Sequence, residues 1–410
     1  MTTEKPQEKT TKTVPPPRLR FKQFEGQGEW EERRLGDYLR ESRISGSNGA
    51  VARKITVKLW GKGVYEKQEA ISGSENTKYF KRSAGQFIYS KLDFLNGAFG
   101  IIPESLDGFE STTDLPAFDF LPGLDPHLLL EYVSREEFYS KFEGGAMGGR
   151  KARRVNPSEL LNTSVPLPSL PEQQHIAATL SSLDDLITAH TDKLEALRQH
   201  KRGLMQGLFP AEGERVPRLR FPEFAEAGEW EEKRLGEVCT VLNNLRKPIT
   251  EAKRVKGEYP YYGASGIVDY VAEYIFDEPL MLVGEDGAKW GAFEKTAFLA
   301  DGKYWVNNHA HVLRTGDTPL SFIENYLVML DLSLYVTGAA PPKLTLGKLK
   351  TIPIPLPSLP EQQRIADCLS SLDDLITAQA DKIAALQEFK RGLMQGLFPS
   401  TTAATQEATE

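Results

Sequence analysis

The side chains best suited to chemistry in this sequence are cationic and aromatic residues that gather in two regions. The first region comprises Lys78, Tyr79, Lys81, Arg82, Tyr89, Lys91, Arg150, Lys151, Arg153 and Arg154. The second comprises Arg246, Lys247, Tyr261, Tyr262, Ser265, Lys303, Tyr304, Trp305, Asn307 and Asn308. Cations pair with phosphates, aromatic rings stack on bases, and amides pair with adenine edges. Both regions therefore predict contact with nucleic acid, although a solvated charge or a core aromatic is the commoner role of any single residue.

Two short segments resemble catalytic motifs, and neither is convincing. Residues 144–151 are a near miss to a phosphate-binding loop, because Arg150 stands where lysine is required and no Ser or Thr follows. Residues 301–303 match a three-residue nuclease fragment, but so short a match is common by chance. An exposed turn is the better interpretation of that tripeptide.

His309 and His311 are the remaining candidates for a metal site. They fall on one face of a predicted strand, but no third ligand stands at metal spacing, so strand packing or base contact is favoured over zinc. The sequence also lacks an adenosylmethionine loop. We therefore expect no catalytic residue, no metal site and no cofactor in this chain, and predict that it is not an enzyme.

Composition limits the class of protein. The 410 residues suffice for two or three domains, and the 40% of apolar residues is typical of globular chains. The two cysteines, Cys239 and Cys368, are 129 positions apart, which excludes a disulfide framework. The net charge of -7 gives no global attraction to DNA, so binding must come from local patches. We expect a soluble, cytoplasmic protein without a membrane segment.

Two pairs of segments show that the sequence is a tandem duplication. Residues 167–210 and 356–399 are identical at 34 of 44 positions, and residues 18–36 and 218–236 at 13 of 19. The residues between these segments show no evident alignment. We therefore expect each half of the chain to consist of a variable domain followed by a helix whose sequence both halves share.

This division predicts seven parts. They are a disordered tail at 1–17, a first variable domain at 18–165, a first helix at 166–210, a linker at 211–217, a second variable domain at 218–354, a second helix at 355–399, and a disordered tail at 400–410.

The shared segments predict long coiled-coil helices. Ser169 with Glu172, and Ser358 with Glu361, form capping-box patterns at their starts. Apolar residues then recur with heptad spacing, interrupted by a polar pair near the midpoints. The predicted seam is Ile176, Leu180, Leu183, Ile187, His190, Leu194 and Leu197 with Ile365, Leu369, Leu372, Ile376, Gln379, Ile383 and Leu386. About 36 residues correspond to about 54 Å of helix. The alternative is an amphipathic helix packed on its own domain.

The predicted fold is α/β (α+β). Strand-like runs at 86–89, 280–283 and 310–313 indicate mixed α/β variable domains. Because the two halves are near copies, we expect the helices to pair antiparallel about a pseudo-twofold, which would hold the two domains at opposite ends of a rod.

The repeated Leu-Pro-x-Leu-Pro-Glu-Gln-Gln and Leu-Asp-Asp-Leu-Ile motifs of residues 167–187 and 356–376 resemble those of the specificity (S, HsdS) subunit of type I restriction-modification systems. The segments 261–267, 284–288, 97–100 and 108–111 add less specific matches, and the resemblance spans residues 18–399. It implies two target-recognition domains, each reading one half of a bipartite double-stranded DNA site. It also implies that two modification subunits, which carry adenosylmethionine and methylate adenine N6, dock on the central helices, and that restriction subunits join them.

A second stripe on the helices is the predicted docking surface for these partners. Small residues recur there every seven positions beside larger apolar ones, about 110° from the seam. The stripe comprises Leu186, Ala189, Ala196, Leu375, Ala378, Ala385 and Phe389. The alternative is that it packs against the chain's own recognition domains. Two alternative functions also stand: a coiled-coil scaffold for proteins only, and the specificity subunit of a methyltransferase system without restriction.

Overall fold

The computed structural model describes residues 12–68, 74–143 and 154–399. The chain divides into two compact units, which we call unit 1 (Met1–Thr188 with Ala384–Glu410) and unit 2 (Ala189–Ile383). Arg150, Lys151 and Arg153 lie outside the described residues. No helix in the described ranges combines the length and apolar character that a membrane span requires.

Unit 1 builds its sheets from twelve short strands among the residues described. They are β1 (Thr13–Val14), β2 (Trp30–Arg34), β3 (Leu39–Ser42), β4 (Ser45–Asn48), β5 (Ile55–Val57), β6 (Val64–Glu66), β7 (Lys78–Lys81), β8 (Phe87–Tyr89), β9 (Phe99–Ile101), β10 (Glu110–Ser111), β11 (Ala117–Phe120) and β12 (Ser164–Leu167). Its shorter helices are α1 (Pro126–Val133), α2 (Glu136–Glu143) and α3 (Pro157–Asn162). The sheet orders are β1-β2-β12, β10-β7-β4, β3-β11-β8-β9 and β5-β6.

Unit 2 is built in the same manner. Its strands are β13 (Glu231–Arg234), β14 (Cys239–Val241), β15 (Lys256–Gly263), β16 (Gly266–Val271), β17 (Phe276–Asp277), β18 (Leu280–Gly284), β19 (Ala297–Ala300), β20 (Lys303–Val306), β21 (Ala310–Thr315) and β22 (Pro353–Leu356). Its shorter helices are α5 (Leu235–Val238), α6 (Leu320–Met329) and α7 (Leu346–Lys350). The sheet orders are β13-β22, β14-β21-β18-β19 and β16-β15-β20-β17.

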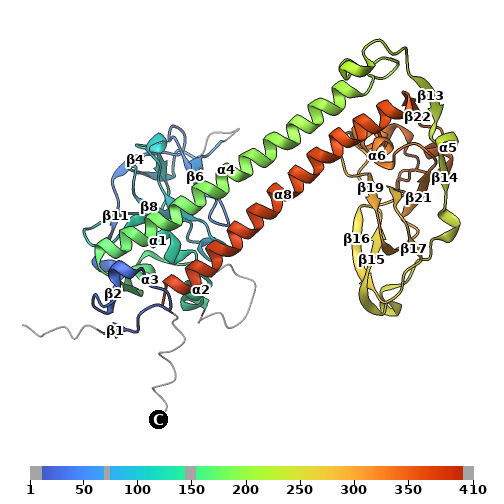
Figure 1. Ribbon diagram of the computed structural model, residues 1–410. Helices are drawn as coiled ribbons and strands as arrows, with labels where there is room; N and C mark the ends of the chain where they lie inside the picture. The colour runs from blue at the N-terminus through green and yellow to red at the C-terminus, as the bar shows by residue number, and fades with distance from the viewer. Residues whose placement is uncertain (1–11, 69–73, 144–153, 400–410) are drawn as a thin grey trace, which may run out of the picture. The chain divides into compact units, whose positions relative to one another are not determined.

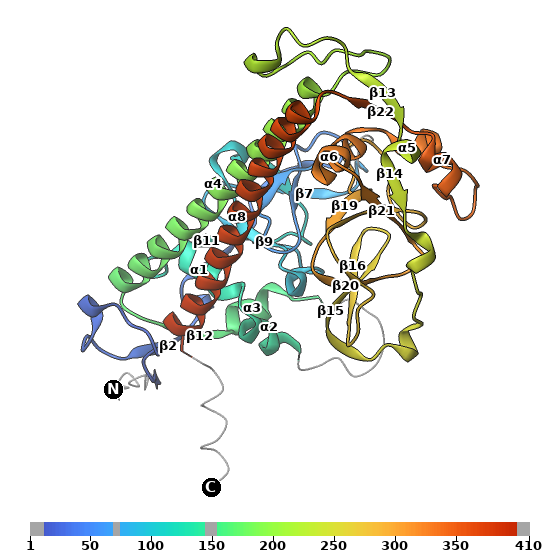
Figure 2. The ribbon, with the colours of Figure 1, turned by 45° about the vertical axis from the view of Figure 1, so that its right-hand side comes forward.

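The two variable domains share a topology that their sequences conceal. The antiparallel order β3-β11-β8-β9 in unit 1 corresponds to β14-β21-β18-β19 in unit 2. In each unit one helix packs beside the last strand of this sheet, α1 on β9 and α6 on β19 (Figure 2). The central strands β8 and β18 are buried along their whole length, which is why they read as continuous apolar runs.

Two long helices complete the fold. They are α4 (Leu170–Leu208) and α8 (Leu359–Leu397), and each has 39 residues. Residues early in α4 contact residues late in α8, so the two helices lie side by side and antiparallel, as predicted (Figure 1). Unit 1 contains the first half of α4 and the end of α8, and unit 2 contains the remainder of both.

Three sequence predictions about boundaries were wrong. Residues 166–167 and 355–356, assigned to helices, belong to β12 and β22, which pair with β2 and β13. Pro166 and Pro355 fit there because these strands lie at sheet edges. Residues 13–14, assigned to a disordered tail, form β1 on β2.

Candidate nucleic-acid surfaces and central helices

In unit 1, β7 presents the predicted cations. Lys78 and Lys81 are exposed and Tyr79 is half-buried, with the Lys54 ammonium 5.7 Å from the centre of its ring. Lys91 is half-buried. The β7 surface can therefore offer two mobile positive charges to phosphates.

Two predicted DNA contacts in unit 1 are structural instead. Arg82 is 2% exposed and donates hydrogen bonds to Ser111 Oγ (2.7 Å) and to the carbonyl oxygens of Ser42 (2.7 Å) and Leu115 (3.2 Å). Burial lowers the pKa of Arg82 to about 10. Tyr89 is fully buried and donates its hydroxyl to Val155 O at 3.1 Å. Neither side chain can reach DNA.

Of the predicted cations at 150–154, Arg154 alone lies in the described part of the chain. It is exposed and pairs with Asp114, with 2.9 Å between Arg154 Nη1 and Asp114 Oδ1. An exposed pair of this kind contributes less than about 1 kcal/mol, so the guanidinium can exchange Asp114 for a phosphate at little cost.

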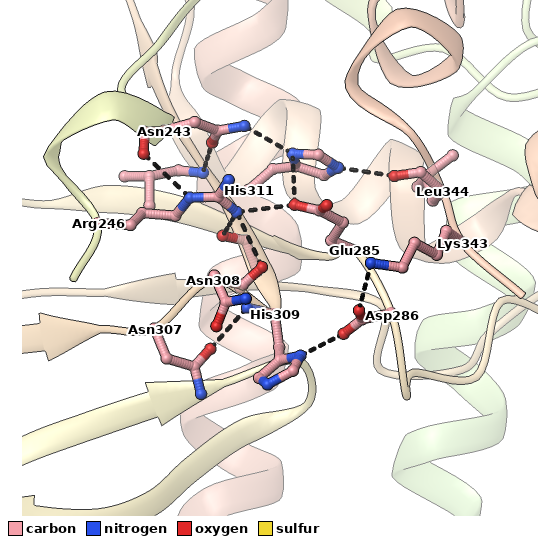
Figure 3. Close-up of polar contacts among 12 residues, drawn as sticks. Asn243, Arg246, Glu285, Asp286, Asn307, Asn308, His309, His311, Lys343 and Leu344 are labelled. Carbon is pink, nitrogen blue, oxygen red and sulfur yellow. Dashed lines mark hydrogen bonds and ion pairs between the residues drawn. The ribbon is translucent and has the colours of Figure 1, made fainter. Parts of the chain in front are cut away.

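In unit 2, Arg246 belongs to a polar network and not to a free surface (Figure 3). Its guanidinium pairs with Glu285 at 2.8 Å and donates to Asn308 O (3.3 Å) and Ala310 O (2.7 Å). Its predicted role as a DNA contact was therefore wrong. Arg246 holds the turn that carries Asn308.

The two histidines of this network have different environments (Figure 3). His311 is fully buried, with Nδ1 beside the Asn243 amide (2.9 Å) and Nε2 beside Leu344 O (2.7 Å). Burial is the main cause that lowers its pKa. His309 is half-exposed and pairs with Asp286, which also binds Lys343 at 2.9 Å. His311 is thus a packing residue, whereas His309 faces solvent.

Four further predicted contacts of unit 2 are buried. Tyr261 lies against Ile249, Tyr304 donates to Glu278 O at 2.9 Å, and Trp305 donates its indole N–H to Lys247 O. Asn307 is 6% exposed, and its Oδ1 accepts from His309 N at 2.8 Å. The prediction was wrong for these side chains, because residue type does not show whether a strand is covered: Tyr304, Trp305 and Val306 of β20 are all buried.

The exposed members of the second region are Lys247, Ser265, Lys303 and Asn308, and Tyr262 is half-buried. Lys303 lies 4.9 Å from the Tyr274 ring centre. The hairpin β15–β16 adds Ile267, Val268 and Tyr270, which are 46%, 56% and 49% exposed. Sequence reasoning did not name these three residues as DNA contacts, and the run Ile-Val-Asp-Tyr at 267–270 has no alternation that would have shown their exposure. The hairpin therefore offers exposed apolar side chains near its turn, and Lys303, at the start of β20, offers a cation farther along the same sheet.

The central helices meet along the predicted seam. All fourteen seam residues are buried or half-buried. Leu180 and Leu369, which have no exposed surface, also belong to the hydrophobic cores of unit 1 and unit 2, so near its start each helix packs on its own domain as well, as the alternative predicted. Within unit 2, Gln379 Nε2 lies 2.8 Å from His190 Nδ1 and 2.8 Å from His190 O. The polar layer is therefore present, and both of its side chains have partners.

Each unit also contains one lysine clamp between α4 and α8, at equivalent positions of the repeat. In unit 2, Lys201 Nζ lies 2.7 Å from both Asp373 oxygens, and in unit 1 Lys390 Nζ lies 2.8 and 2.7 Å from those of Asp184. Lys390 also binds Glu131 of α1 at 3.0 Å. This contact ties the unit 1 domain to its helix pair.

Sequence reasoning missed a buried arginine–glutamate ion pair at the start of each long helix, which we call the arginine pair. Arg20 forms a two-pronged bond with Glu172 (2.8 and 2.7 Å), and Arg220 forms the same bond with Glu361 (2.7 and 2.8 Å). Both carboxylates are 1% exposed. These glutamates, which we expected to cap the helices, bind the segments that precede β2 and β13. The signal was available, since each partner recurs in both copies of the repeat.

The predicted docking stripe is open to solvent. Leu186, Leu375 and Phe389 are 43%, 55% and 61% exposed. The four alanines at 189, 196, 378 and 385 are also exposed. The alternative, in which the stripe packs on the recognition domains, was therefore wrong for these seven residues.

Comparison with known proteins supports a single family. The type I restriction modification DNA specificity domain matches residues 128–199 and 227–388, more than half of the chain. A type I restriction enzyme specificity subunit of Methanocaldococcus jannaschii is 24% identical over 90% of this chain and 92% of its own length. A Haemophilus influenzae protein named as such a subunit is 40% identical, but that match spans 37% of this chain and 39% of the relative.

A solved structure extends the similarity to the fold. The type I restriction-modification S subunit from M. genitalium aligns over 94% of this chain and 100% of its own length, with a TM-score of 0.61 and 17% identity. This degree of identity supports the fold alone. With the family match, it follows that the chain belongs to the specificity subunits of type I restriction-modification systems, a family of DNA-recognition subunits.

Proposed function

We propose that the two recognition domains read the two halves of a bipartite DNA site, and that partner subunits supply the adenosylmethionine and the methylation chemistry. The observation that carries this proposal is that both units contain the same supporting contacts and the same sheet, which we call the frame, but expose different surfaces. The frame comprises the arginine pairs, the lysine clamps and the sheet that bears α1 or α6. Base readout depends on side chains and their geometry, so equal frames with unequal surfaces fit two different half-sites.

The central helices set the distance between the half-sites in this proposal. A helix of 39 residues is about 58 Å long, which limits the span between the half-sites to about 17 base pairs. Half-sites about one helical turn apart would present both to the same face of the duplex. The site therefore consists of two short specific sequences separated by a non-specific gap.

The exposed stripe is the docking surface for two modification subunits, and restriction subunits join through them. Small side chains at seven-residue intervals let another helix approach closely. Ala189 and Ala196 in the first copy correspond to Ala378 and Ala385 in the second, so the repeat offers one such surface per copy. Two equivalent surfaces on one chain predict two bound modification subunits.

The independence of the two recognition domains is tested by exchanging residues 37–165 for the first domain of another specificity subunit. Methylation-sensitive sequencing of DNA modified by the complex should then show one half-site changed and the other retained. A simultaneous change of both half-sites would overturn the proposal.

The docking surface is tested by Ala189→Glu with Ala196→Glu, which buries charge at the proposed interface. Native mass spectrometry should show one modification subunit lost and one retained. Ala378→Glu with Ala385→Glu is the matched variant and should give the same stoichiometry. Retention of both subunits by a folded variant would exclude this stripe as the docking surface.

A further inference from the structure

Trp60 stands apart from the other tryptophans of the chain. Its side chain is 71% exposed, whereas Trp30, Trp230 and Trp305 are 0%, 2% and 8% exposed. Trp290 is half-buried and donates its indole N–H to Gly284 O at 3.2 Å. Exposing so large an apolar ring is costly unless something covers it, so this position calls for an explanation.

The backbone of Trp60 is held in an unfavourable conformation. Its φ of 63° places it in the left-handed region, where a bulky side chain is an outlier. Phe293, with φ 62°, is the other such non-glycine residue among those described, and its ring packs against the unit 2 core. Packing therefore explains Phe293. Trp60 has the same backbone but presents its ring to solvent.

The loop that carries Trp60 is fixed to the domain by its backbone. Trp60 N donates to Asn96 O and Gly61 N to Gly97 O, both at 2.8 Å. A Cβ on Gly97 would lie 3.1 Å from Trp60 Cα, and one on Gly100 would lie 2.7 Å from Val64 Cγ2. The 97–100 segment therefore leaves room for the hairpin β5–β6 that presents Trp60. Because the loop is held in place, the ring has a defined position before any ligand binds.

The surroundings of Trp60 are positively charged. Residues 54–67 contain four lysines and one glutamate, a net charge of +3 in a chain of net charge -7. Lys58, Lys62 and Lys67 are exposed. The backbone of Lys54 forms an isolated β-bridge with Glu110 of β10, and β10 pairs with β7. The hairpin therefore neighbours the strand that presents Lys78 and Lys81. An exposed aromatic ring among cations is complementary to bases flanked by phosphates.

We propose that Trp60 is a base-contacting residue of unit 1, which stacks on or wedges against the bases of its half-site while the neighbouring lysines bind phosphates. This inference rests on the proposed reading of one half-site by unit 1. Apolar side chains that enter a base step partly unstack it, and stacking on a base contributes about 1–3 kcal/mol.

The test uses the complete complex with its modification subunits and the duplex identified by methylation sequencing. Trp60→Ala should weaken binding of this duplex by about tenfold or more, whereas Trp60→Phe, which retains a ring, should lose less than about threefold. Leu334→Ala removes a side chain that is 76% exposed in unit 2, and serves as the matched control with unchanged affinity. Binding by Trp60→Ala within twofold of the wild type would overturn the proposal.

A second variant separates binding from folding. Trp60→Gly relieves the left-handed conformation and should raise the melting temperature by about 2–4 °C, yet weaken DNA binding as much as Trp60→Ala does. If instead Trp60→Ala loses a modification subunit in native mass spectrometry, the ring is a protein contact and the proposal is wrong. Failure of the proposed function is distinguishable, because the wild-type complex would then methylate no bipartite site.

Discussion

Unit 1 and unit 2 have the same contacts where the sequence repeats and different exposed surfaces where it does not. The Arg20–Glu172 and Arg220–Glu361 pairs agree in every distance to within 0.1 Å. By contrast, unit 1 presents a tryptophan on a short hairpin, and unit 2 presents the apolar tip of β15–β16. The comparison teaches that the repeated residues hold the domain on its helices, which leaves the remaining residues free to diverge.

The equivalence of the two units is tested most directly by removing the buried arginine from one unit at a time. Arg20→Ala and Arg220→Ala each leave a buried carboxylate without its partner, which costs about 3–5 kcal/mol. Calorimetry should show equal losses of stability in the two variants. Arg20→Lys and Arg220→Lys keep the charge without the two-pronged bond and should fall between. Losses that differ by more than about 1 kcal/mol would contradict the equivalence of the frames.

The polar layer of the seam is the next test. Gln379→Ala leaves His190 without its side-chain partner and should lower the free energy of unfolding by about 1–3 kcal/mol. Replacing both residues by Leu removes both polar groups and should raise the melting temperature while loosening the selection of gap length. A fall in melting temperature of the double variant as large as that of Gln379→Ala would show that packing, and not polarity, limits this layer.

The burial of Glu324, which lies near the Lys201–Asp373 clamp, should make the stability of unit 2 depend on pH. Burial is the main cause that raises the pKa of Glu324 on α6 to about 7, above its ordinary value of 4.5. The folded state therefore binds this proton more tightly, so the stabilisation is complete below about pH 4.5 and is lost as the pH rises through about 7. Glu324→Gln should flatten the melting temperature of unit 2 between pH 5 and 8. An unchanged slope would assign the pH dependence to other groups.

The smallest expected effect concerns the exposed lysines of β7. Lys78→Ala with Lys81→Ala should weaken binding to all sequences and reduce the salt slope by about two units, because each phosphate contact contributes about 0.9. Lys348→Ala, on the exposed part of α7, is the control and should leave the slope unchanged. A changed recognition sequence with an unchanged slope would place the β7 lysines on base edges.

The repeat made the helical frame predictable from sequence, because heptad spacing fixes which side of a long helix is covered. His190 and Gln379 illustrate this, since the predicted polar layer of the seam joins them at 2.8 Å. The recognition surfaces were less predictable. Tyr89 and Tyr304 look like base-stacking residues in sequence, but β8 and β20 carry them into the core.

Arg82 and Trp60 show why local sequence fails at the surfaces themselves. Arg82 is covered because carbonyl groups of Ser42 and Leu115, distant in sequence, converge on it. Trp60 is exposed because the 97–100 segment fixes its backbone. Both outcomes depend on contacts between segments far apart in the chain, which spacing along one segment does not reveal.

The two cysteines differ in reactivity, which allows labels to be placed at equivalent positions of the repeat. Burial raises the pKa of the Cys239 thiol to about 12, so this thiol is inert to maleimides at neutral pH. Cys368 on α8 is half-buried, and its counterpart in the first copy is Thr179 on α4. Thr179→Cys therefore creates two reporter thiols at equivalent positions, one in each unit. Spin labels at the two sites would report, as a distance distribution, whether DNA binding changes the separation of the two units.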